Sequence, residues 1–85
     1  MYQIAFTPHG EQELAALPKN IQQRIHKKLC DNSTLPNPLV RARHLVDLPP
    51  ATHRFRIGQY RVSFFIEGKT IFVERIELRG RAYRR

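Results

Sequence analysis

Three arginines fall within the eight residues RFRIGQYR, at positions 54, 56 and 61. The two-residue turn Gly58-Gln59 predicts a β-hairpin in which Arg56 lies opposite Arg61. Arg54 projects from the same face, because side chains alternate along a strand. A guanidinium is permanently charged and can grip phosphate oxygens through two parallel donors. The spacing therefore predicts a phosphate-binding surface on one face of the hairpin.

The charge of the whole chain supports this prediction. Across 85 residues, 15 Lys and Arg stand against 7 Asp and Glu, which gives a net charge of +8. Such a charge favours a polyanionic partner: nucleic acid, the ribosome, an acidic protein or an anionic membrane. Membrane is the weakest candidate, because no lipid-facing amphipathic helix is evident. A solvated basic sheet face is the alternative, although like charges directly across a strand pair are destabilising.

Other chemical classes are disfavoured. We expect no metal and no cofactor, because the four histidines lack the spacing of metal ligands. A single cysteine, Cys30, excludes an internal disulfide and fits a cytoplasmic location. No apolar run approaches the roughly 20 residues that span a bilayer, and the N-terminus lacks the pattern of a secretory signal. The length predicts a single domain over residues 1–85.

The first half of the chain predicts one strand and two helices. The alternating run YQIAF, residues 2–6, reads as a strand. Thr7 followed by Pro8 marks the start of a helix over about 8–16. A second helix follows Pro18, and residues of turn type over 31–38 end it. Its apolar face has a four-residue spacing: Ile21, Ile25 and Leu29. The connection between the helices is very short, so we expect a helical hairpin.

The second half predicts an antiparallel meander of three or four strands. HRFRI, YRVSFFI and TIFVERIEL are strand-like runs, separated by turns at Gly58-Gln59 and Glu67-Gly68-Lys69. A further extended segment is expected around residues 43–46. One face of the sheet should pack on the helices, and the other should carry Arg54, Arg56, Arg61 and Ser63. The expected fold class is α+β.

Two blocks of this sequence resemble the RelE/ParE superfamily of bacterial and archaeal toxins. They are YQIAFTPHGEQELAALPKNIQQRI and HRFRIGQYRVSFFIEGKTIFVERIELRGRAY. The second block is similar to the family pattern of a basic strand, a G-x-Y-R turn, an apolar strand and a closing R-x-x-x-Y, here Arg79 to Tyr83. The RGRAY ending looks like the archaeal and thermophilic RelE branch. The resemblance covers nearly the whole chain and implies a RelE-like fold.

The resemblance implies the toxin of a type II toxin–antitoxin system. RelE-like members are ribosome-dependent, metal-independent endoribonucleases that cleave messenger RNA in the ribosomal A site and inhibit translation. ParE-like members inhibit DNA gyrase without a catalytic step, and a shared fold does not decide between these activities. The basic strand together with Arg61, Arg79 and Tyr83 favours the nuclease. A noncatalytic or degenerate RNA-binding homologue is a further alternative.

The resemblance also implies roles for individual residues. Arg61 and Arg79 align with the family arginines that stabilise the phosphate in the transition state, and Tyr83 aligns with the terminal catalytic tyrosine. Arg54 and Arg56 align with positions that are often lysine, where a lysine of lowered pKa acts as base. An arginine does not readily give up its proton, so we expect these two to orient RNA.

The proton-transfer groups are less defined than the phosphate clamp. Nearby cations lower the pKa of a phenol from about 10, which makes Tyr83 the best general acid or base; packing against the core is its alternative role. His53, beside the arginines, is a second candidate base. The family often has Gly-His before the closing arginine, whereas this chain has Glu77-Leu78. Neither Glu77 nor Leu78 is a convincing substitute for that histidine. Arg81 is expected to contact RNA phosphate.

Partners follow from the same resemblance. It implies a RelB-like antitoxin, and we expect an acidic amphipathic helix of that antitoxin against the helices or the basic sheet face. The ribosome and messenger RNA are the other expected partners, and operator DNA would be bound only through the antitoxin. The sequence leaves the register of the last strand open. Phe65 and Phe72 can lie on the polar face in one register, where packing is the more common role and base stacking is the alternative.

Overall fold

Strand β1 (Gln3–Phe6) leads into helices α1 (Pro8–Ala15) and α2 (Lys19–Ser33) and then a single 3-10 turn, η1 (Pro38–Arg41). Four strands complete the fold: β2 (Ala42–His44), β3 (His53–Ile57), β4 (Tyr60–Glu67) and β5 (Thr70–Leu78). This computed structural model describes residues 1–78. The predicted site residues Arg79, Arg81 and Tyr83 lie outside the described residues.

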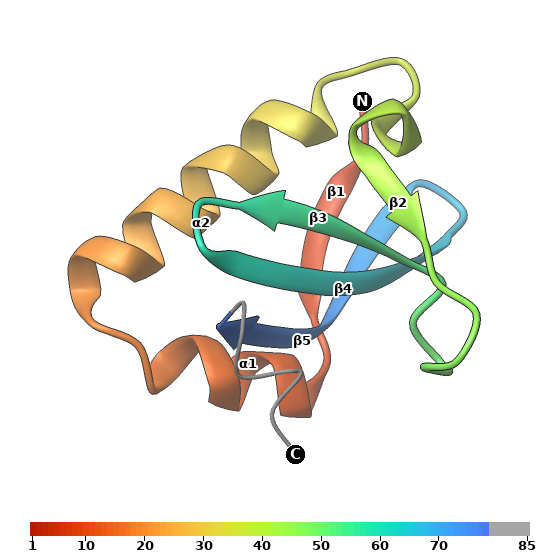
Figure 1. Cartoon of the computed structure of the whole chain (residues 1–85). Helices are drawn as coiled ribbons and strands as arrows, with labels where there is room; N and C mark the ends of the chain where they lie inside the picture. Colours follow the sequence, from red (N-terminus) through yellow and green to blue (C-terminus); the bar gives the residue numbers. More distant parts are fainter. Residues whose placement is uncertain (79–85) are drawn as a thin grey trace.

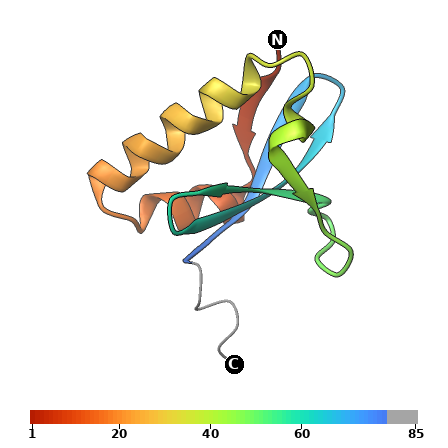
Figure 2. The ribbon, with the colours of Figure 1, turned by 45° about the horizontal axis from the view of Figure 1, so that its top comes forward.

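The strands form one mixed sheet in the order β1-β5-β4-β3-β2 (Figure 1). Strands β2 to β5 pair with one another in antiparallel orientation, which confirms the predicted meander and the α+β class. Strand β1 adds to the sheet beside β5 in parallel orientation. The predicted pair of helices is present, and the two helices open from their short connection as a V (Figures 1 and 2).

Helix α1 begins at the predicted cap and lies very close to the sheet. The Thr7 hydroxyl accepts a hydrogen bond from the Gly10 N–H at 3.1 Å and donates to the Val73 carbonyl at 3.2 Å. A Cβ on residue 10 would overlap the Val73 carbonyl oxygen of β5. Glycine weakens a helix intrinsically, so its presence here is explained by the close approach of helix and strand.

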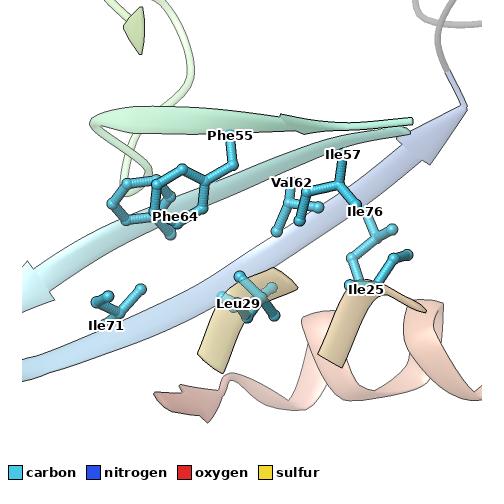
Figure 3. Packing of buried hydrophobic residues seen from close by; sticks show 9 residues of the cluster. Ile25, Leu29, Phe55, Ile57, Val62, Phe64, Ile71 and Ile76 are labelled. Carbon is cyan, nitrogen blue, oxygen red and sulfur yellow. The ribbon is translucent and has the colours of Figure 1, made fainter. Parts of the chain in front are cut away.

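Helix α2 carries the predicted apolar stripe into the core. Ile25 and Leu29 are fully buried and point toward the sheet, against a cluster to which every strand of the meander from β3 to β5 contributes (Figure 3). The members of this cluster on the sheet are Phe55, Ile57, Val62, Phe64, Ile71, Val73 and Ile76. The helix runs to Ser33, into the segment where turn residues were expected. The Ser33 carbonyl accepts a hydrogen bond from Tyr2 N–H at 2.8 Å, which ties this last turn to the start of β1.

The hairpin register is the one predicted. Ile57 pairs with Tyr60 and Arg56 with Arg61, and the turn begins at Gly58 with a φ of 61°. Few residues other than glycine adopt this left-handed conformation. The second turn is one residue shorter than expected, because Glu67 already pairs with Thr70 and only Gly68-Lys69 turns. The hairpin therefore fixes which side chains share a face.

The connection between α2 and β3 departs from expectation in detail. Strand β2 covers residues 42–44 rather than the expected 43–46, and η1 precedes it. The Asn37 side chain accepts a hydrogen bond from the Leu39 N–H at 3.2 Å, which starts this turn locally. Over residues 1–78, no helix combines the length and the apolar character that crossing a bilayer requires.

Candidate nucleic-acid interface

The predicted arginines lie on the sheet face opposite the helices. Phe55 and Val62 point to the core and are 1% and 0% exposed. Side chains alternate along strands, so Arg54, Arg56 and Arg61 project from the other face. In the register, Arg56 lies opposite Arg61 and Arg54 lies opposite Ser63. We call this outward side of β2 to β5 the arginine face.

A hollow of about 510 Å³ opens on the arginine face. It combines the predicted arginines of β3 and β4 with residues of η1 and β2. Its lining residues are Val40, Arg41, Ala42, Arg43, Arg54, Arg56 and Arg61. We call it the arginine groove. Five of its seven lining residues are cations, so the groove should concentrate anions strongly.

The sequence prediction missed two of these cations, Arg41 and Arg43. Strand β2 pairs with β3 so that Arg43 lies opposite Arg54. The segment VRARH has the same R-x-R spacing as HRFR. That repeated spacing is the signal that could have identified them. The pairing of a three-residue edge strand, which brings them to the groove, is not visible in the sequence.

Arg61 is the most deeply placed cation of the groove, with 7% of its surface exposed. A cation at this depth needs charged or polar neighbours. Glu77 on β5 lies directly opposite Arg61 in the register and brings a carboxylate to the adjoining strand position. The Glu77 carboxylate accepts from Arg75 at 3.1 Å. The arginine face therefore continues onto β5 as an ion pair beside the deepest arginine.

His53 is not brought together with the arginines. It lies opposite Phe64 in the register and stacks on that core ring, with centroids 6.0 Å apart. The His44 ring meets it edge-on at 5.0 Å, and the Thr52 hydroxyl is 2.9 Å from His53 Nδ1. Burial and the neighbouring His44 lower the pKa of His53. A side chain on the helix-facing side of β3 is poorly placed to take a proton from RNA on the opposite face.

Phe65 and Phe72 lie on the arginine face, farther along β4 and β5, which resolves the register that the sequence left open. They are partners in the register, and their rings stack with centroids 5.3 Å apart and planes 17° apart. Both side chains are half-buried. Each ring thus packs on the other, and neither lines the arginine groove.

The described residues show what the groove can and cannot do chemically. Guanidinium groups can bind a phosphodiester and stabilise the extra charge that develops in phosphoryl transfer. They do not readily accept a proton, so a general base must come from elsewhere. No cluster of three or more His, Cys, Asp or Glu side chains able to hold a metal occurs within residues 1–78. The roles expected of Arg79, Arg81 and Tyr83 stay predictions, because these residues fall beyond that range.

Solved structures share this fold over nearly the whole chain. The toxin–antitoxin complex RelBE2 from Mycobacterium tuberculosis matches with 24% identity and a TM-score of 0.77, covering 92% of this chain and 98% of that chain. The archaeal RelE–RelB complex from Pyrococcus horikoshii OT3 matches with 24% identity and a TM-score of 0.71, covering 94% and 97%. A chromosomal ParDE system from P. aeruginosa matches with 17% identity and a TM-score of 0.69, covering 93% and 97%. No protein-family model and no curated protein matches the sequence.

Proposed function

We propose that this chain, which has the fold of the RelE and ParE toxins, is the toxin of a type II toxin–antitoxin system. Its proposed activity is that of a ribosome-dependent, metal-independent endoribonuclease that cleaves messenger RNA in the ribosomal A site. Such cleavage inhibits translation in the cytoplasm. The observation that carries this proposal is the arginine groove, in which Arg56 and Arg61 face each other across β3 and β4.

The proposed reaction is an intramolecular phosphoryl transfer. The 2′-oxygen of one ribose attacks its own 3′-phosphate, the bond from phosphorus to the leaving 5′-oxygen breaks, and a 2′,3′-cyclic phosphate forms. Arg56 and Arg61 bind the non-bridging oxygens and stabilise their growing charge. The 2′-hydroxyl proton passes to a base and the 5′-oxygen receives a proton. Tyr83 is proposed to carry one of these two proton transfers, as general acid or general base, and Arg79 is proposed as an additional phosphate ligand.

Dependence on the ribosome follows from the composition of the groove. Five arginines supply charge stabilisation but no strong base. Holding the reacting atoms in line can provide about 7–11 kcal/mol of a reaction barrier. A ribosome that fixes the messenger RNA against the groove would provide this positioning. We therefore expect weak cleavage of free RNA.

An antitoxin is the proposed protein partner. The M. tuberculosis and P. horikoshii structures are complexes of a toxin with its antitoxin. A net charge of +8 would be matched by an acidic antitoxin segment laid over the arginine face or the helices. Any binding of the complex to operator DNA is assigned to the antitoxin.

Inhibition of DNA gyrase is the second candidate function, favoured by the likeness to the P. aeruginosa ParDE system. A gyrase inhibitor works by docking on a protein and does not require facing arginines that enclose a hollow. A degenerate toxin that binds RNA without cutting it is the remaining alternative, supported by arginine at positions 54 and 56, where the resemblance leads one to expect lysine. The nuclease explains the groove best.

Primer extension on a messenger RNA translated in a reconstituted system tests the proposal. We expect new 5′ ends at A-site codons that require ribosomes and that disappear with Arg61→Ala. Lys28→Gln, an exposed charge change on α2, is the matched control and should cut like the wild type. Intact message with unaffected translation would refute the nuclease, and a gyrase supercoiling assay would then test the second candidate.

A further inference from the structure

The arginine groove contains two facing pairs of arginines rather than one. Arg56 of β3 lies opposite Arg61 of β4, and Arg54 of β3 lies opposite Arg43 of β2. All four line the same hollow. We call Arg56 and Arg61 the inner pair, and Arg43 and Arg54 the outer pair.

Building on the ribonuclease function proposed above, we propose that the groove binds two consecutive phosphates of one RNA strand. The inner pair holds the phosphate that is cut, and the outer pair holds the neighbouring phosphate. Arg43 is thereby a positioning residue that keeps the RNA strand in register with the inner pair. Arg41, at the end of η1, adds a further cation at this side of the groove.

The number of charges argues for more than one phosphate. Each phosphodiester carries a single negative charge, whereas the groove is lined by five arginines. One bound phosphate would leave the outer pair uncompensated, and like charges directly across a strand pair destabilise a sheet. Two phosphates give each facing pair its own anion. A guanidinium pair around one phosphate also satisfies the preference of arginine for two-point contacts.

The size of the groove agrees with this count. A volume of about 510 Å³ lies within the ~300–1,000 Å³ of pockets that hold drug-sized ligands, and a single phosphate group is much smaller. Neighbouring strands lie about 4.8 Å apart and residues rise about 3.4 Å along a strand. The centres of the two pairs are one strand and two residues apart, or roughly 8 Å. One nucleotide of extended backbone can span such a separation.

The lining favours an RNA backbone over an acidic helix. An amphipathic helix binds by burying its apolar face in an apolar groove. Among the described lining residues only Val40 and Ala42 are apolar, and Val40 is 71% exposed at the groove's side. A sugar–phosphate backbone needs no apolar floor. Its phosphates are regularly spaced negative charges, and the inner and outer arginine pairs can each bind one of them.

Short oligonucleotides test the two-phosphate site without any cleavage. A dinucleotide with one phosphodiester and a trinucleotide with two, both carrying 2′-deoxyribose so that they cannot be cut, are titrated into the isolated chain. We expect the wild type to bind the trinucleotide several-fold more tightly. Arg43→Gln should abolish this gain, and the affinity lost for the trinucleotide should exceed several-fold the loss for the dinucleotide that follows from removing one positive charge. Each phosphate contact contributes about −0.7 to the slope of log K against log salt for a single strand. The slope for trinucleotide binding should therefore be less steep by about this amount in Arg43→Gln than in the wild type.

Controls keep the outcome interpretable. Arg43 is exposed, so Arg43→Gln should fold, as thermal melting would verify, and Lys28→Gln should not alter the trinucleotide gain. Equal binding of both oligonucleotides by the wild type, or an unchanged gain in Arg43→Gln, would overturn the two-phosphate site. An oligoglutamate peptide with the same charge as the trinucleotide is a second control. If this peptide binds as tightly as the trinucleotide and loses as much affinity in Arg43→Gln, the groove binds an acidic protein segment and the two-phosphate site is wrong.

Translation assays separate this inference from the proposed function. Arg43→Gln should raise the toxin concentration needed for half-maximal cleavage by a larger factor than it lowers the maximal rate, whereas Arg61→Ala should mainly lower the maximal rate. A wild type that cuts nothing on the ribosome would refute the nuclease, while the oligonucleotide titrations would still decide whether the two-phosphate site exists. A loss of maximal rate in Arg43→Gln as large as that in Arg61→Ala would contradict the assignment of Arg43 to the neighbouring phosphate.

Discussion

Arg56 and Arg61 occupy directly opposed positions on β3 and β4, so the sheet holds two cations where opposite charges would stabilise it. Cross-strand pairs contribute roughly 0.2–1 kcal/mol, and like charges act against stability. We predict that Arg56→Gln raises the free energy of unfolding by an amount in this range at low salt. The gain should shrink as salt screens the pair.

The same substitution should weaken RNA binding. Urea unfolding at low and high ionic strength, combined with oligonucleotide titration, measures both effects on one variant. Lys28→Gln, at an exposed position of α2, is the control and should change neither quantity appreciably. A less stable Arg56→Gln protein would show that the opposed arginines do not repel in the free chain.

Toxicity should depend on the inner pair and on the closing residues of the chain. We predict that Arg61→Ala, Arg79→Ala and Tyr83→Phe each relieve growth inhibition in cells that express the chain. Loss of one donor to a developing oxyanion lowers a rate by about 10²–10³-fold. Arg61→Lys keeps the charge but loses two-point binding, so it should recover only part of the activity.

Growth curves and cleavage rates, with thermal melts to establish that each variant folds, provide the measurement. If Arg61→Ala, Arg79→Ala and Tyr83→Phe all remain fully toxic, the site assigned to cleavage is wrong. Toxicity that persists without RNA cleavage would instead indicate a different target, such as gyrase.

Gly10 should tolerate no side chain. Because a Cβ there would overlap the Val73 carbonyl oxygen, Gly10→Ala must push α1 away from β5 despite the higher helix propensity of alanine. Overpacking of this kind costs typically about 1–3 kcal/mol, and we expect a loss of stability in that range. Gln12→Ala, at an exposed position of the same helix, should change stability by less than about 0.5 kcal/mol. Chemical denaturation compares the two, and a stabilised Gly10→Ala protein would contradict the close contact.

Local patterns in the sequence predicted the parts of the fold that local chemistry determines. Thr7-Pro8 predicted the start of α1, and the alternation around Gly58-Gln59 predicted the register of the hairpin and hence the facing arginines. The parallel pairing of β1 with β5 joins residues 3–6 to 70–73. No local pattern encodes this long-range contact, which depends on how the helices return the chain to the sheet.

The sequence predicted the arginines of the hairpin but not the rest of the arginine groove, for a related reason. Arg54, Arg56 and Arg61 belong to one hairpin, whereas Arg43 reaches them through a three-residue strand that follows a loop-rich segment. His53 shows the converse effect. It is adjacent to Arg54 in sequence, yet strand alternation sends its ring to the core side, where it stacks on Phe64. Adjacency along a strand separates side chains, and pairing across strands brings them together.

His53 should make stability depend on pH. Its pKa is lowered from the ordinary value of 6.5 by burial and by the neighbouring His44. The unfolded chain therefore binds a proton more readily than the folded chain, and stability rises with pH wherever this difference exists. Stability contributed by neutral His53 is fully present above pH 6.5. It is lost as the pH falls from there through the lower folded pKa, below which the loss is complete.

Urea unfolding between pH 8 and pH 5 in variants of these two histidines measures the effect of this linkage. His53→Gln should flatten the part of the pH dependence that lies just below 6.5. His44→Gln should reduce that part without abolishing it, because burial, the larger cause of the lowered pKa, persists. His26→Gln, on the exposed side of α2, is the control and should leave the profile of the wild type in place. A His53→Gln profile identical to that of the wild type would show that another group governs stability in this range.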